Sequence, residues 1–468
     1  MRSWIDMAKS GKAYIASLED GESASSAEGL LNEPKAKHPS WRDKEAAERF
    51  FWFMMPSFVA RAFGHASDNS EIPAANATSY LNGLRGLASF IVTIAHSTDD
   101  FLWVYHGWGE TAEDRYLVQL PIIRLAFCGT YMVTIFFVIS GFVLTYGPLK
   151  KIHSGQGFDA ISSLPSSIFR RPFRLFMPVV PILVITCILI HYQAFYSPPL
   201  REPLGPVANG IWSQITFIWH TLLTIITQNT TATIMPQGWT LSVEYQGSLL
   251  VFLCCIAFAR TSALVRISCA LGLIVFFLQI GVWQQCLFLS GMILADVRHA
   301  RQKLPPLTGA AHKAANVASW LLLVFGLFLG GWPTHGNGYA AVGYSWFTWV
   351  PTAGMDPTRL FPAIGAVALV TALENLPVLQ RYLNSRWALY LGEISFELYL
   401  VHWFVGRSSA TWGLKFQMLD AGYSITVAWT VTFAIMLMLS IWFADVFWRL
   451  IDRKSVRFAH WLSKKLGI

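Results

Sequence analysis

The sequence predicts an all-α protein, a polytopic transmembrane helix bundle with about ten spanning helices. Hydrophobic residues make up 54% of the 468-residue chain and charged residues only 13%, against roughly 25% charged in soluble domains. The 20 tryptophans and 33 phenylalanines suit aromatic belts at two membrane interfaces. The net charge of +8 arises from basic residues clustered between apolar segments. This pattern follows the positive-inside rule, and it indicates a lipid bilayer and no nucleic acid as partner.

Residues 1–79 are predicted to be a cytoplasmic, polar N-terminal region. Its first 49 residues are polar and of mixed charge, so we expect disorder and no signal peptide there. Residues 50–63 are aromatic and apolar but too short to span a bilayer, so we expect an interfacial segment on the membrane surface. The first spanning helix would then act as its own insertion signal.

The membrane domain is predicted to cover residues 80–450. The first span is expected at about 83–103 and the second at about 129–147. A basic loop follows, and a third span ends near Tyr192. Further apolar stretches lie at about 211–228, 241–259, 263–281, 283–297, 316–332, 358–376, 387–405 and 423–448.

The positions of the basic loops determine whether the number of membrane crossings between them is even or odd. Residues 148–174 and 298–313 are both expected in the cytoplasm, so an even number of crossings must join them. The third span supplies one crossing, and the four apolar stretches within 211–297 must supply three, so one of them does not cross fully. The total is ten, both termini are cytoplasmic, and residues 451–468 form a basic cytoplasmic tail.

The cysteines are expected to be structural. They lie in or beside apolar segments and lack the paired spacing of metal sites. We therefore expect free thiols that pack as small hydrophobic side chains, and no metal. The six are Cys128, Cys187, Cys254, Cys255, Cys269 and Cys286.

Arg85 and His96 lie inside the first apolar segment, where a charged side chain is costly and marks a candidate functional site. Eleven residues at 100° each return to within about 20° of the same face, roughly 16 Å along the axis. Asp100, four residues after His96, is placed to hydrogen-bond the imidazole and fix its tautomer. We predict a site in which a cation holds an anionic donor and an imidazole acts at its reactive end.

Two later motifs also place polar groups in apolar segments. In Gly238-Trp-Thr-Leu-Ser-Val-Glu244, the carboxylate serves either as a proton acceptor or buried hydrogen-bonding group, or as the partner of an arginine. In Leu391–His402 (LGEISFELYLVH), a continuous helix would place Glu393 and Glu397 on one face and Ser395, Tyr399 and His402 on roughly the opposite one. Both faces would then be buried in the bundle or line a water-filled cavity. The alternative is that these polar side chains form hydrogen bonds between helices.

These motifs together resemble the acyltransferase 3 family of membrane O-acyltransferases. Gly83-Leu-Arg-Gly-Leu-Ala88, with His96 eleven residues after Arg85, resembles the first helix of the family, although the family usually has Asp where this chain has Asn82. Phe136–Phe142 (FFVISGF) resembles the second-helix signature, in which Ser140 and Gly141 are small enough for close packing. The other matches, in family order, are Arg170–Pro178 (RRPFRLFMP), Gly238–Glu244 and Leu391–His402.

The resemblance covers about residues 80–450 and implies a core of ten spans. It also implies a fungal-type O-acyltransferase, with an O-acetyltransferase favoured. Such an enzyme moves an acyl group from cytoplasmic acyl-CoA, with acetyl-CoA favoured, to a hydroxyl of a small lipophilic metabolite or a sugar. Arg85, Arg170, Arg171 and Arg174 would hold the CoA phosphates, because guanidinium groups bind phosphate bidentately. His96 would act as general base or carry the acyl group briefly, with Asp100 orienting it.

The remaining candidates are Glu244 for catalysis, and a group that either contacts the acceptor or packs between helices. That group is Trp239, Glu393, Ser395, Tyr399 and His402. A different class of protein also uses intramembrane Glu, His and Arg, namely a proton-coupled transporter or a lipid-linked sugar flippase. No inverted repeat and no matching pair of Gly/Pro-broken helices is visible in the sequence, which favours the enzyme.

Overall fold

The computed structural model describes residues 44–65, 75–99, 101–196, 201–205, 210–227, 232, 234–352 and 354–468. The chain divides into two compact units, Met1–Ala66 and Ser67–Ile468. In the described ranges the regular structure is helical, and β-pairing is limited to isolated bridges such as Phe195 with Ser408. The predicted all-α class is confirmed. Disorder was predicted for residues 1–49. Residues 1–43 lie outside the described residues, and the prediction is wrong for residues 44–49, which form the start of the helix Lys44–Met54.

The described part of the first unit consists of two short helices, α3 (Lys44–Met54) and α4 (Ser57–Ala62). Pro56 lies between them with φ −51° and ψ 139°, an extended conformation that ends the first helix and begins the second. Phe51 and Phe63 are exposed. The predicted interfacial segment 50–63 is therefore aromatic and largely helical, but broken at its proline.

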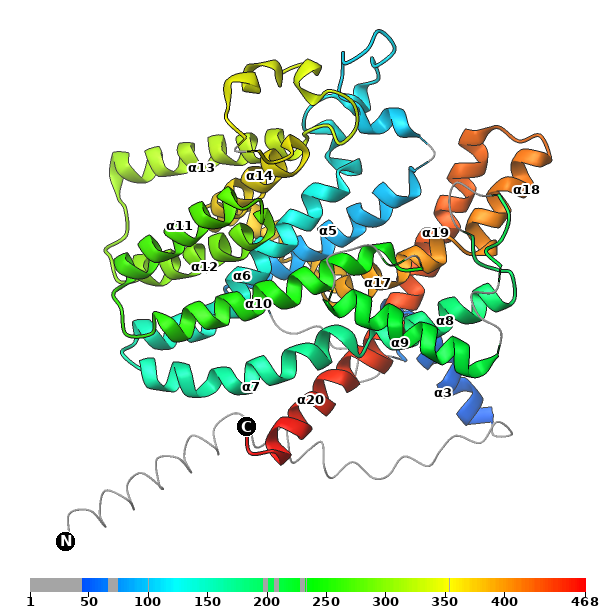
Figure 1. The fold of residues 1–468 in the computed structure, drawn as a ribbon, viewed down its shortest axis with the longest axis horizontal. Coiled ribbons are helices and arrows are strands. Elements are labelled where there is room, and N and C mark those ends of the chain that lie inside the picture. The colour runs from blue at the N-terminus through cyan, green and yellow to red at the C-terminus, as the bar shows by residue number, and fades with distance from the viewer. Residues whose placement is uncertain are drawn as a thin grey trace. The chain divides into compact units, whose positions relative to one another are not determined.

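The second unit contains the membrane-type helices, and α6 is its central element. This helix packs against α5, α7, α10, α12 and α14, while α13 pairs with α14 and α17 with α19. Figure 1 shows α7, α10, α12 and α13 extending in roughly the same direction. The helices are α5 (Ser79–Ser97), α6 (Gly129–His153), α7 (Gly157–Phe176), α8 (Val179–His191), α9 (Ile211–Thr227), α10 (Trp239–Ala257), α11 (Ala263–Gln279), α12 (Trp283–Arg301), α13 (Gly309–Gly330), α14 (Pro357–Glu374), α15 (Pro377–Leu383), α16 (Arg386–Glu393), α17 (Ser395–Gly406), α18 (Leu414–Asp420), α19 (Ile425–Phe447) and α20 (Arg453–Lys465).

Glycines allow the closest helix pairs to form. A Cβ at Gly141 of α6 would overlap the carbonyl oxygen of Phe288 in α12, and one at Gly291 of α12 would overlap the carbonyl oxygen of Val138 in α6. Gly326 and Gly365 make the same kind of backbone contact between α13 and α14. Small residues at such crossings are typical of helix packing in membranes, where van der Waals contact drives association.

Among the described residues, five helical segments are long and apolar enough to cross a membrane, and a sixth is the bent pair α14 and α15. The predicted count of ten is not confirmed by length and composition. Several predicted spans are short: α9 and α11 have 17 residues each, and α17 has 12.

Residues 148–174 were predicted to form a cytoplasmic loop, and the prediction of a loop is wrong. Residues to His153 continue α6, and most of the remainder forms the 20-residue helix α7. Arginines at Arg170, Arg171 and Arg174 made this stretch look like a loop. In the structure α7 is amphipathic and buries Leu164 and Leu175, so its basic residues are presented from a helix.

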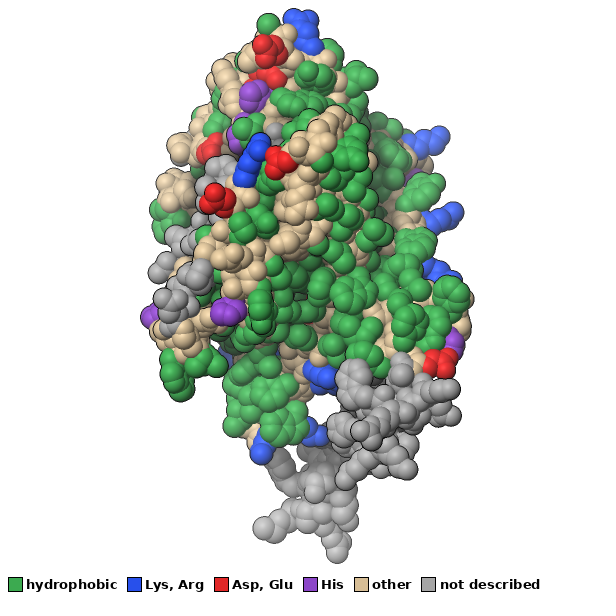
Figure 2. Space-filling view, turned by 90° about the vertical axis from the view of Figure 1, so that its right-hand side faces the viewer, with side chains coloured by type: hydrophobic (Ala, Val, Ile, Leu, Met, Phe, Trp, Pro, Cys, Tyr) green, Lys and Arg blue, Asp and Glu red, His purple; other side chains and the backbone are tan. Residues whose placement is uncertain are grey.

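Apolar side chains also cover much of the outside of the second unit. Val180, Val184 and Ile188 form an exposed stripe along α8, at the four-residue spacing of one helix face. Other exposed stripes lie on α13 and α19, and Figure 2 shows hydrophobic side chains predominating over the lower middle of one side of the molecule. A surface of this kind is suited to contact with lipid.

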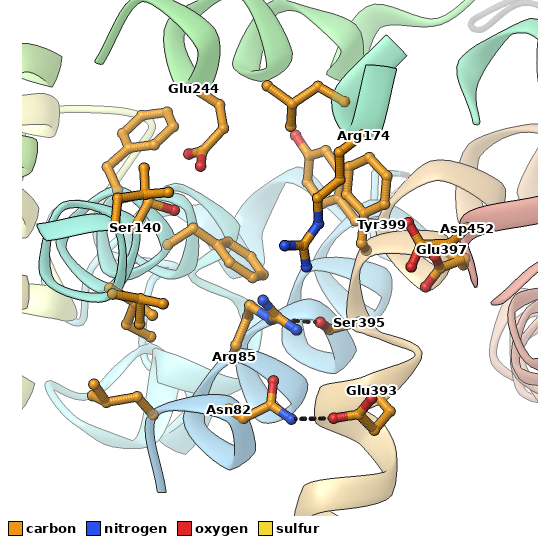
Figure 3. Close-up of a pocket in the computed structure, with 18 of the residues that line it drawn as sticks. Asn82, Arg85, Ser140, Arg174, Glu244, Glu393, Ser395, Glu397, Tyr399 and Asp452 are labelled. Carbon is orange, nitrogen blue, oxygen red and sulfur yellow. Dashed lines mark hydrogen bonds between the residues drawn. The ribbon is translucent and has the colours of Figure 1, made fainter. Parts of the chain in front are cut away.

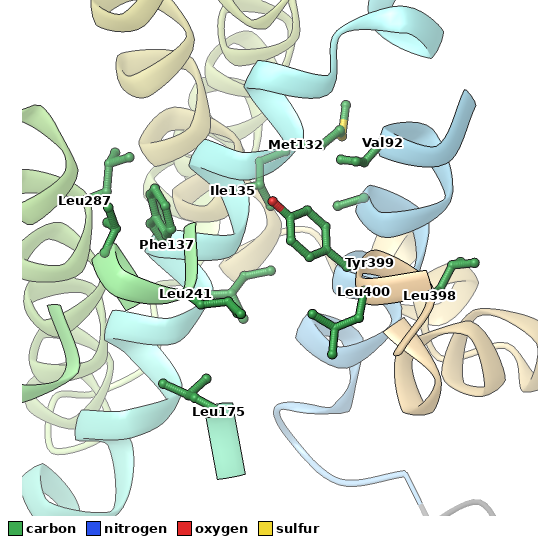
Figure 4. Close-up of a cluster of buried hydrophobic side chains, with 14 of the residues drawn as sticks. Val92, Met132, Ile135, Phe137, Leu175, Leu241, Leu287, Leu398, Tyr399 and Leu400 are labelled. Carbon is green, nitrogen blue, oxygen red and sulfur yellow. The ribbon is translucent and has the colours of Figure 1, made fainter. Parts of the chain in front are cut away.

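The buried core surrounds α6. Phe137 stacks on Phe288 with ring centroids 5.4 Å apart, and Figure 4 shows Phe137 and Leu287 on one side of the cluster and Leu398 to Leu400 on the other. Tyr399 carries its hydroxyl into this otherwise apolar cluster. The core therefore borders the polar groups of α17, which leads to the candidate site.

Candidate active site

A cavity of about 460 Å³ opens between α5, α6, α7, α10, α16 and α17. Its size falls within the range of pockets that bind small molecules, roughly 300–1,000 Å³. Figure 3 shows polar side chains converging on it from these helices and from the segment after α19. The polar lining includes Asn82, Arg85, Ser140, Arg171, Arg174, Thr240, Glu244, Glu393, Ser395, Glu397, Tyr399 and Asp452.

Arg85 is held at one wall of this cavity by the close contact of α5 with α16. A Cβ at Gly86 would overlap the backbone of α16 at Leu391 and Gly392, so the two helices touch through their backbones. At this separation Arg85 Nε donates to Ser395 Oγ at 2.9 Å, and its Nη2 donates to the carbonyl oxygen of Gly392 at 3.0 Å. The predicted role of Arg85 in a site is consistent with this position.

A break at Ile394 decides which residues of the late motif face the cavity. Ile394 has φ −90° and ψ 4°, and it separates α16 from α17. The helical wheel drawn for a continuous helix was wrong for this reason. Glu393, Ser395, Glu397 and Tyr399 all line the cavity instead of dividing between two opposite faces.

Asn82 shares the lower part of this wall with Glu393. The Asn82 Nδ2 donates to Glu393 Oε1 at 2.8 Å, as Figure 3 shows. An amide can donate this hydrogen bond, whereas a carboxylate at the same place would face a second carboxylate. Asn82 therefore acts here as a hydrogen-bond donor.

Glu244 and the arginines of α7 form the upper wall. Arg171 makes an ion pair with Glu244, and its Nε donates to Ser248 Oγ at 2.8 Å. The arginine-paired interpretation of Glu244 is thus the one that the geometry supports. Arg174 points into the cavity toward Arg85 (Figure 3), and no residue in the described part of the chain accepts a hydrogen bond from it.

Arg170 does not join this group. Its Nη1 lies 2.8 Å from His460 Nδ1 in α20, and its Nε donates to the carbonyl oxygen of Ser166. The three arginines occupy one helix at positions i, i+1 and i+4, so two can share a face while the third points elsewhere. Arg171 and Arg174 line the cavity, and Arg170 does not.

Asp452 is a site residue that the sequence reasoning did not name, and Glu397 was named in the late motif but was not among the candidate site residues. Glu397 is 2% exposed, and neither of its carboxylate oxygens has a hydrogen-bond partner among the described residues. Asp452 lies beside it (Figure 3), and both carboxylates interact electrostatically with Arg85 and Arg174. A carboxylate directly after the last span was the available signal for Asp452.

His96 does not line this cavity. Its ring stacks on His402 with centroids 5.2 Å apart and planes 20° apart, and the edge of Trp403 approaches at 5.5 Å. The ring of His402 in turn lies 5.8 Å from that of Tyr399, whose hydroxyl donates to the carbonyl oxygen of Gln237 at 3.1 Å. Tyr399 therefore links the cavity wall to the histidine pair through the ring of His402.

A second, small cavity of about 30 Å³ borders His96 on another side. Its lining includes Arg407, Trp412, Lys415 and Trp429. A cavity of this size holds water, since about 10–15 Å³ is enough for one molecule. Arg85 and His96 therefore lie in adjoining but separate spaces, although they share a stripe of α5.

The predicted orienting carboxylate Asp100 lies outside the described residues. Its neighbour Asp99 forms an ion pair with Arg407 and accepts a hydrogen bond from Tyr105 at 3.4 Å. Trp239, another candidate, packs edge-on against Phe137 with ring centroids 6.4 Å apart and is not part of the cavity wall. Its packing role is the one that the geometry supports.

His106, Glu110 and Asp114, between α5 and α6, are a group with metal-ligand chemistry. Their candidate ligand atoms lie within 4.8 Å of one another. Asp114 already accepts hydrogen bonds from Thr111 at 2.7 Å and Gln119 at 2.8 Å. Burial alone would raise the pKa of Asp114, but the hydrogen bonds from Thr111, Gln119 and His106 hold it below its usual value. The proximity of these three side chains is therefore explained by hydrogen bonding within the loop.

The fold and the cavity define a membrane-type helix bundle with a charged site between its helices, and sequence comparison places it in a family. A family model described as an acyltransferase domain matches residues 78–449. The chain belongs to this family. No solved structure matches it.

Several curated fungal proteins are similar to nearly the whole chain. The O-acetyltransferase PaAT-1 of Phomopsis amygdali is 29% identical over 96% of this chain and 97% of its own length. The acyltransferase clz18 of Cochliobolus lunatus is 23% identical over 80% of this chain and 93% of its own length. The protein is accordingly an acyltransferase by family.

Proposed function

We propose that the protein is an O-acetyltransferase that moves an acetyl group from acetyl-CoA to a hydroxyl of a small lipophilic metabolite or a sugar. The observation that carries this proposal is the pair of guanidinium groups, Arg85 and Arg174, that face each other across the cavity (Figure 3). Two like charges brought together in a buried site repel each other, and an anion between them relieves the repulsion. The name of the Phomopsis relative supports the acetyl group and the oxygen acceptor.

The donor would enter at the start of α5. Asn76 is exposed and Thr78 half-buried at the rim of the cavity, and this end of α5 is the one expected in the cytoplasm. Arg85 and Arg174 would bind donor phosphate, while Arg171 is already paired with Glu244. The acyl end would then point past Ser395 toward Tyr399.

The chemistry requires a base close to the acyl end. In the proposed reaction the acceptor oxygen forms a bond to the thioester carbonyl carbon, and the bond from that carbon to sulfur breaks. The hydroxyl proton passes to the imidazole of His96 and is returned to the CoA thiolate, so that no net proton is consumed. The position of His96 against His402, whose ring approaches that of Tyr399, supports this assignment.

The experiment that tests the proposal incubates membranes containing the protein with acetyl-CoA labelled in the acetyl group and a lipophilic cell extract, and then identifies labelled products. Arg174→Gln should raise the KM for acetyl-CoA about ten- to a hundredfold, because a charge-assisted hydrogen bond contributes roughly 1.5–3 kcal/mol. The kcat should change little if the bond is equal in the ground and transition states.

Arg170→Gln is the matched control, since Arg170 is in the same helix but lies against His460. Its KM should remain within about twofold of the parent value. Equal effects of the two substitutions would contradict the proposed donor site, and absence of any labelled product would contradict the proposed reaction.

A further inference from the structure

His402 contains a buried atom whose hydrogen-bonding capacity is unused. The side chain is 0% exposed. Its Nδ1 lies 3.2 Å from the carbonyl oxygen of Leu398, and because a carbonyl only accepts, Nδ1 must carry the hydrogen. The opposite nitrogen, Nε2, is then a hydrogen-bond acceptor. No residue in the described part of the chain donates to it.

Tyr399 and Ser395, two other polar residues of the same helix, are satisfied, whereas the carboxylate of Glu397 is not satisfied by any described residue. Tyr399 accepts from Thr240 Oγ1 at 2.9 Å and donates to Gln237, and Ser395 accepts from Arg85 and donates to Gly392. Unpaired polar atoms inside proteins are rare, because a buried acceptor without a partner has lost its hydrogen bonds to water. The unpaired Nε2 of His402 therefore requires an explanation.

The location of this atom provides one. The ring of His402 lies between that of Tyr399, which lines the large cavity, and that of His96, which borders the small one. Both substrates of the proposed reaction must bring their reacting groups to this place. Each of them carries a hydrogen-bond donor close to its reacting atom.

We infer that Nε2 of His402 accepts a hydrogen bond from a substrate N–H or O–H that arrives beside His96. This inference rests on the proposed function. His402 is then a substrate-binding residue that fixes the reacting group next to the base. The same hydrogen bond would satisfy the buried nitrogen only in the substrate complex.

Two sources supply the donor. The first is the amide N–H of the pantetheine arm closest to the thioester, which would place the acetyl group between Tyr399 and His96. The second is the hydroxyl of the acceptor, which His402 would hold beside His96. The two sources predict different kinetic changes, and the experiment separates them.

The first arm changes the donor. The parent protein is assayed with acetyl-CoA and with an analogue in which the amide nearest the thioester is replaced by an ester, so that only the N–H is lost. If the pantetheine amide is the source, the KM for the analogue should be about three- to tenfold higher, as expected for loss of one neutral hydrogen bond. This difference should disappear in His402→Asn.

The second arm changes the protein. His402→Asn keeps an amide nitrogen near the position of Nδ1, facing Leu398, and removes Nε2. His402→Gln places an amide near the position of Nε2 and can accept a hydrogen bond but not a proton. If the acceptor hydroxyl is the source, His402→Asn should lower kcat, His402→Gln should lower it less because it can still accept a hydrogen bond, and the KM for acetyl-CoA should be unchanged.

His299→Gln is the control for exchanging a buried histidine. Its Nε2 contacts the carbonyl oxygen of Tyr146 at 3.0 Å, a bond that the glutamine amide can replace, so its kinetic constants should match the parent. All constants are normalised to monodisperse protein. If His402→Asn does not yield such protein, His402→Phe, which keeps a flat ring against His96, replaces it.

Parent-like kinetics of the His402 variants, together with equal KM values for acetyl-CoA and its ester analogue, would overturn the inference. A parent protein that transfers nothing from acetyl-CoA would instead overturn the proposed function. The two failures are therefore distinguishable in the same set of assays.

Discussion

His96 was selected as a candidate site residue from its sequence context, but the residues that surround it could not be predicted in the same way. The helical stripe of α5 gives the direction in which its side chain points, but not the neighbours that other helices supply. In the structure these neighbours are His402 and Trp403 of α17. His96 does not line the large cavity.

His96→Ala should abolish acetyl transfer while the protein is still produced and inserted. The proposed reaction loses its base, and general base catalysis typically contributes 10²- to 10⁴-fold. The measurement is turnover of labelled acetyl-CoA, with membrane content determined by immunoblot. His191→Ala, which removes an exposed histidine at the end of α8, is the control. Near-normal turnover of the His96 variant would end the proposed role.

Much of the cavity wall was predictable residue by residue. Arg85, Glu244, Glu393, Ser395 and Tyr399 were selected as polar groups in apolar segments, and Arg171 and Arg174 through the motif that resembles the family. All seven line one cavity. Asp452 was missed because its approach to Glu397 depends on how the chain continues after α19. No local pattern encodes that path.

At the scale of the helices, glycine residues allow the close contact between α6 and α12. Gly141→Ala should lower the thermal stability of the purified protein, because the added methyl group would overlap Phe288. Overpacking of this kind typically costs about 1–3 kcal/mol. The measurement is a thermal melt in detergent.

Gly147 provides a control within the same helix. A Cβ at Gly147 meets nothing within 4 Å, so Gly147→Ala should melt at the parent temperature or slightly above it. Alanine also has the better helix propensity. A loss of stability as large as that of Gly141→Ala would show that the backbone contact is not the cause.

The loop between α5 and α6 should depend on pH through Asp114. Its pKa is lower in the folded loop than its ordinary value of 3.8, so the ionised form stabilises the loop. This stabilisation is complete above the ordinary value and is lost as the pH falls through the folded-state pKa. Asp114→Asn should therefore exchange its loop amides faster at neutral pH, by about tenfold.

Hydrogen exchange of residues 102–119, corrected for intrinsic rates, measures this effect. The difference between parent and variant should shrink as the pH falls below 3.8 through the lowered pKa of Asp114, because the carboxylate of the parent then becomes protonated. Thr348→Ala in the loop before α14 is the control, because Thr348 bonds only Ser345 nearby. A difference that does not vary with pH would contradict the role of the ionised carboxylate.

At the scale of the whole molecule, the ends of α6 and α12 lie on one side of the bundle. Lys303 Nζ donates to the carbonyl oxygen of His153 at 2.5 Å, which joins the ends of the two helices. The sequence predicts that this side is cytoplasmic, because the basic residues gather there. Cysteines at positions 151 and 301 should therefore react with an impermeant thiol reagent only after permeabilisation.

Trp346→Cys is the opposite control. Trp346 is exposed in the loop after α13, at the other end of a helix long enough to cross, so it should react on intact membranes. Cys269, the half-buried native cysteine, is first replaced by serine. Reaction of position 151 or 301 on intact membranes would reverse the proposed orientation.

The helical class and the extent of the acyltransferase domain were predictable, because apolar composition and the order of several motifs are properties of the whole chain. The number of crossings was not. Hydropathy cannot distinguish a span from a shorter helix that is buried by its neighbours, as for α17, where Leu398, Leu400 and Val401 are all buried. The prediction of a loop at 148–174 failed because two of its charged residues, Arg171 and Arg174, face a protein cavity from a helix and not the solvent from a loop.

The break at Ile394 makes the chain intolerant of changes in length at this point. Each residue of a helix turns the following side chains by about 100°. One residue inserted at the start of α17 would leave Asn82 and Glu393 paired, but it would rotate Tyr399 and His402 away from the cavity and from His96. Natural variation in chain length should therefore be absent between Glu393 and His402.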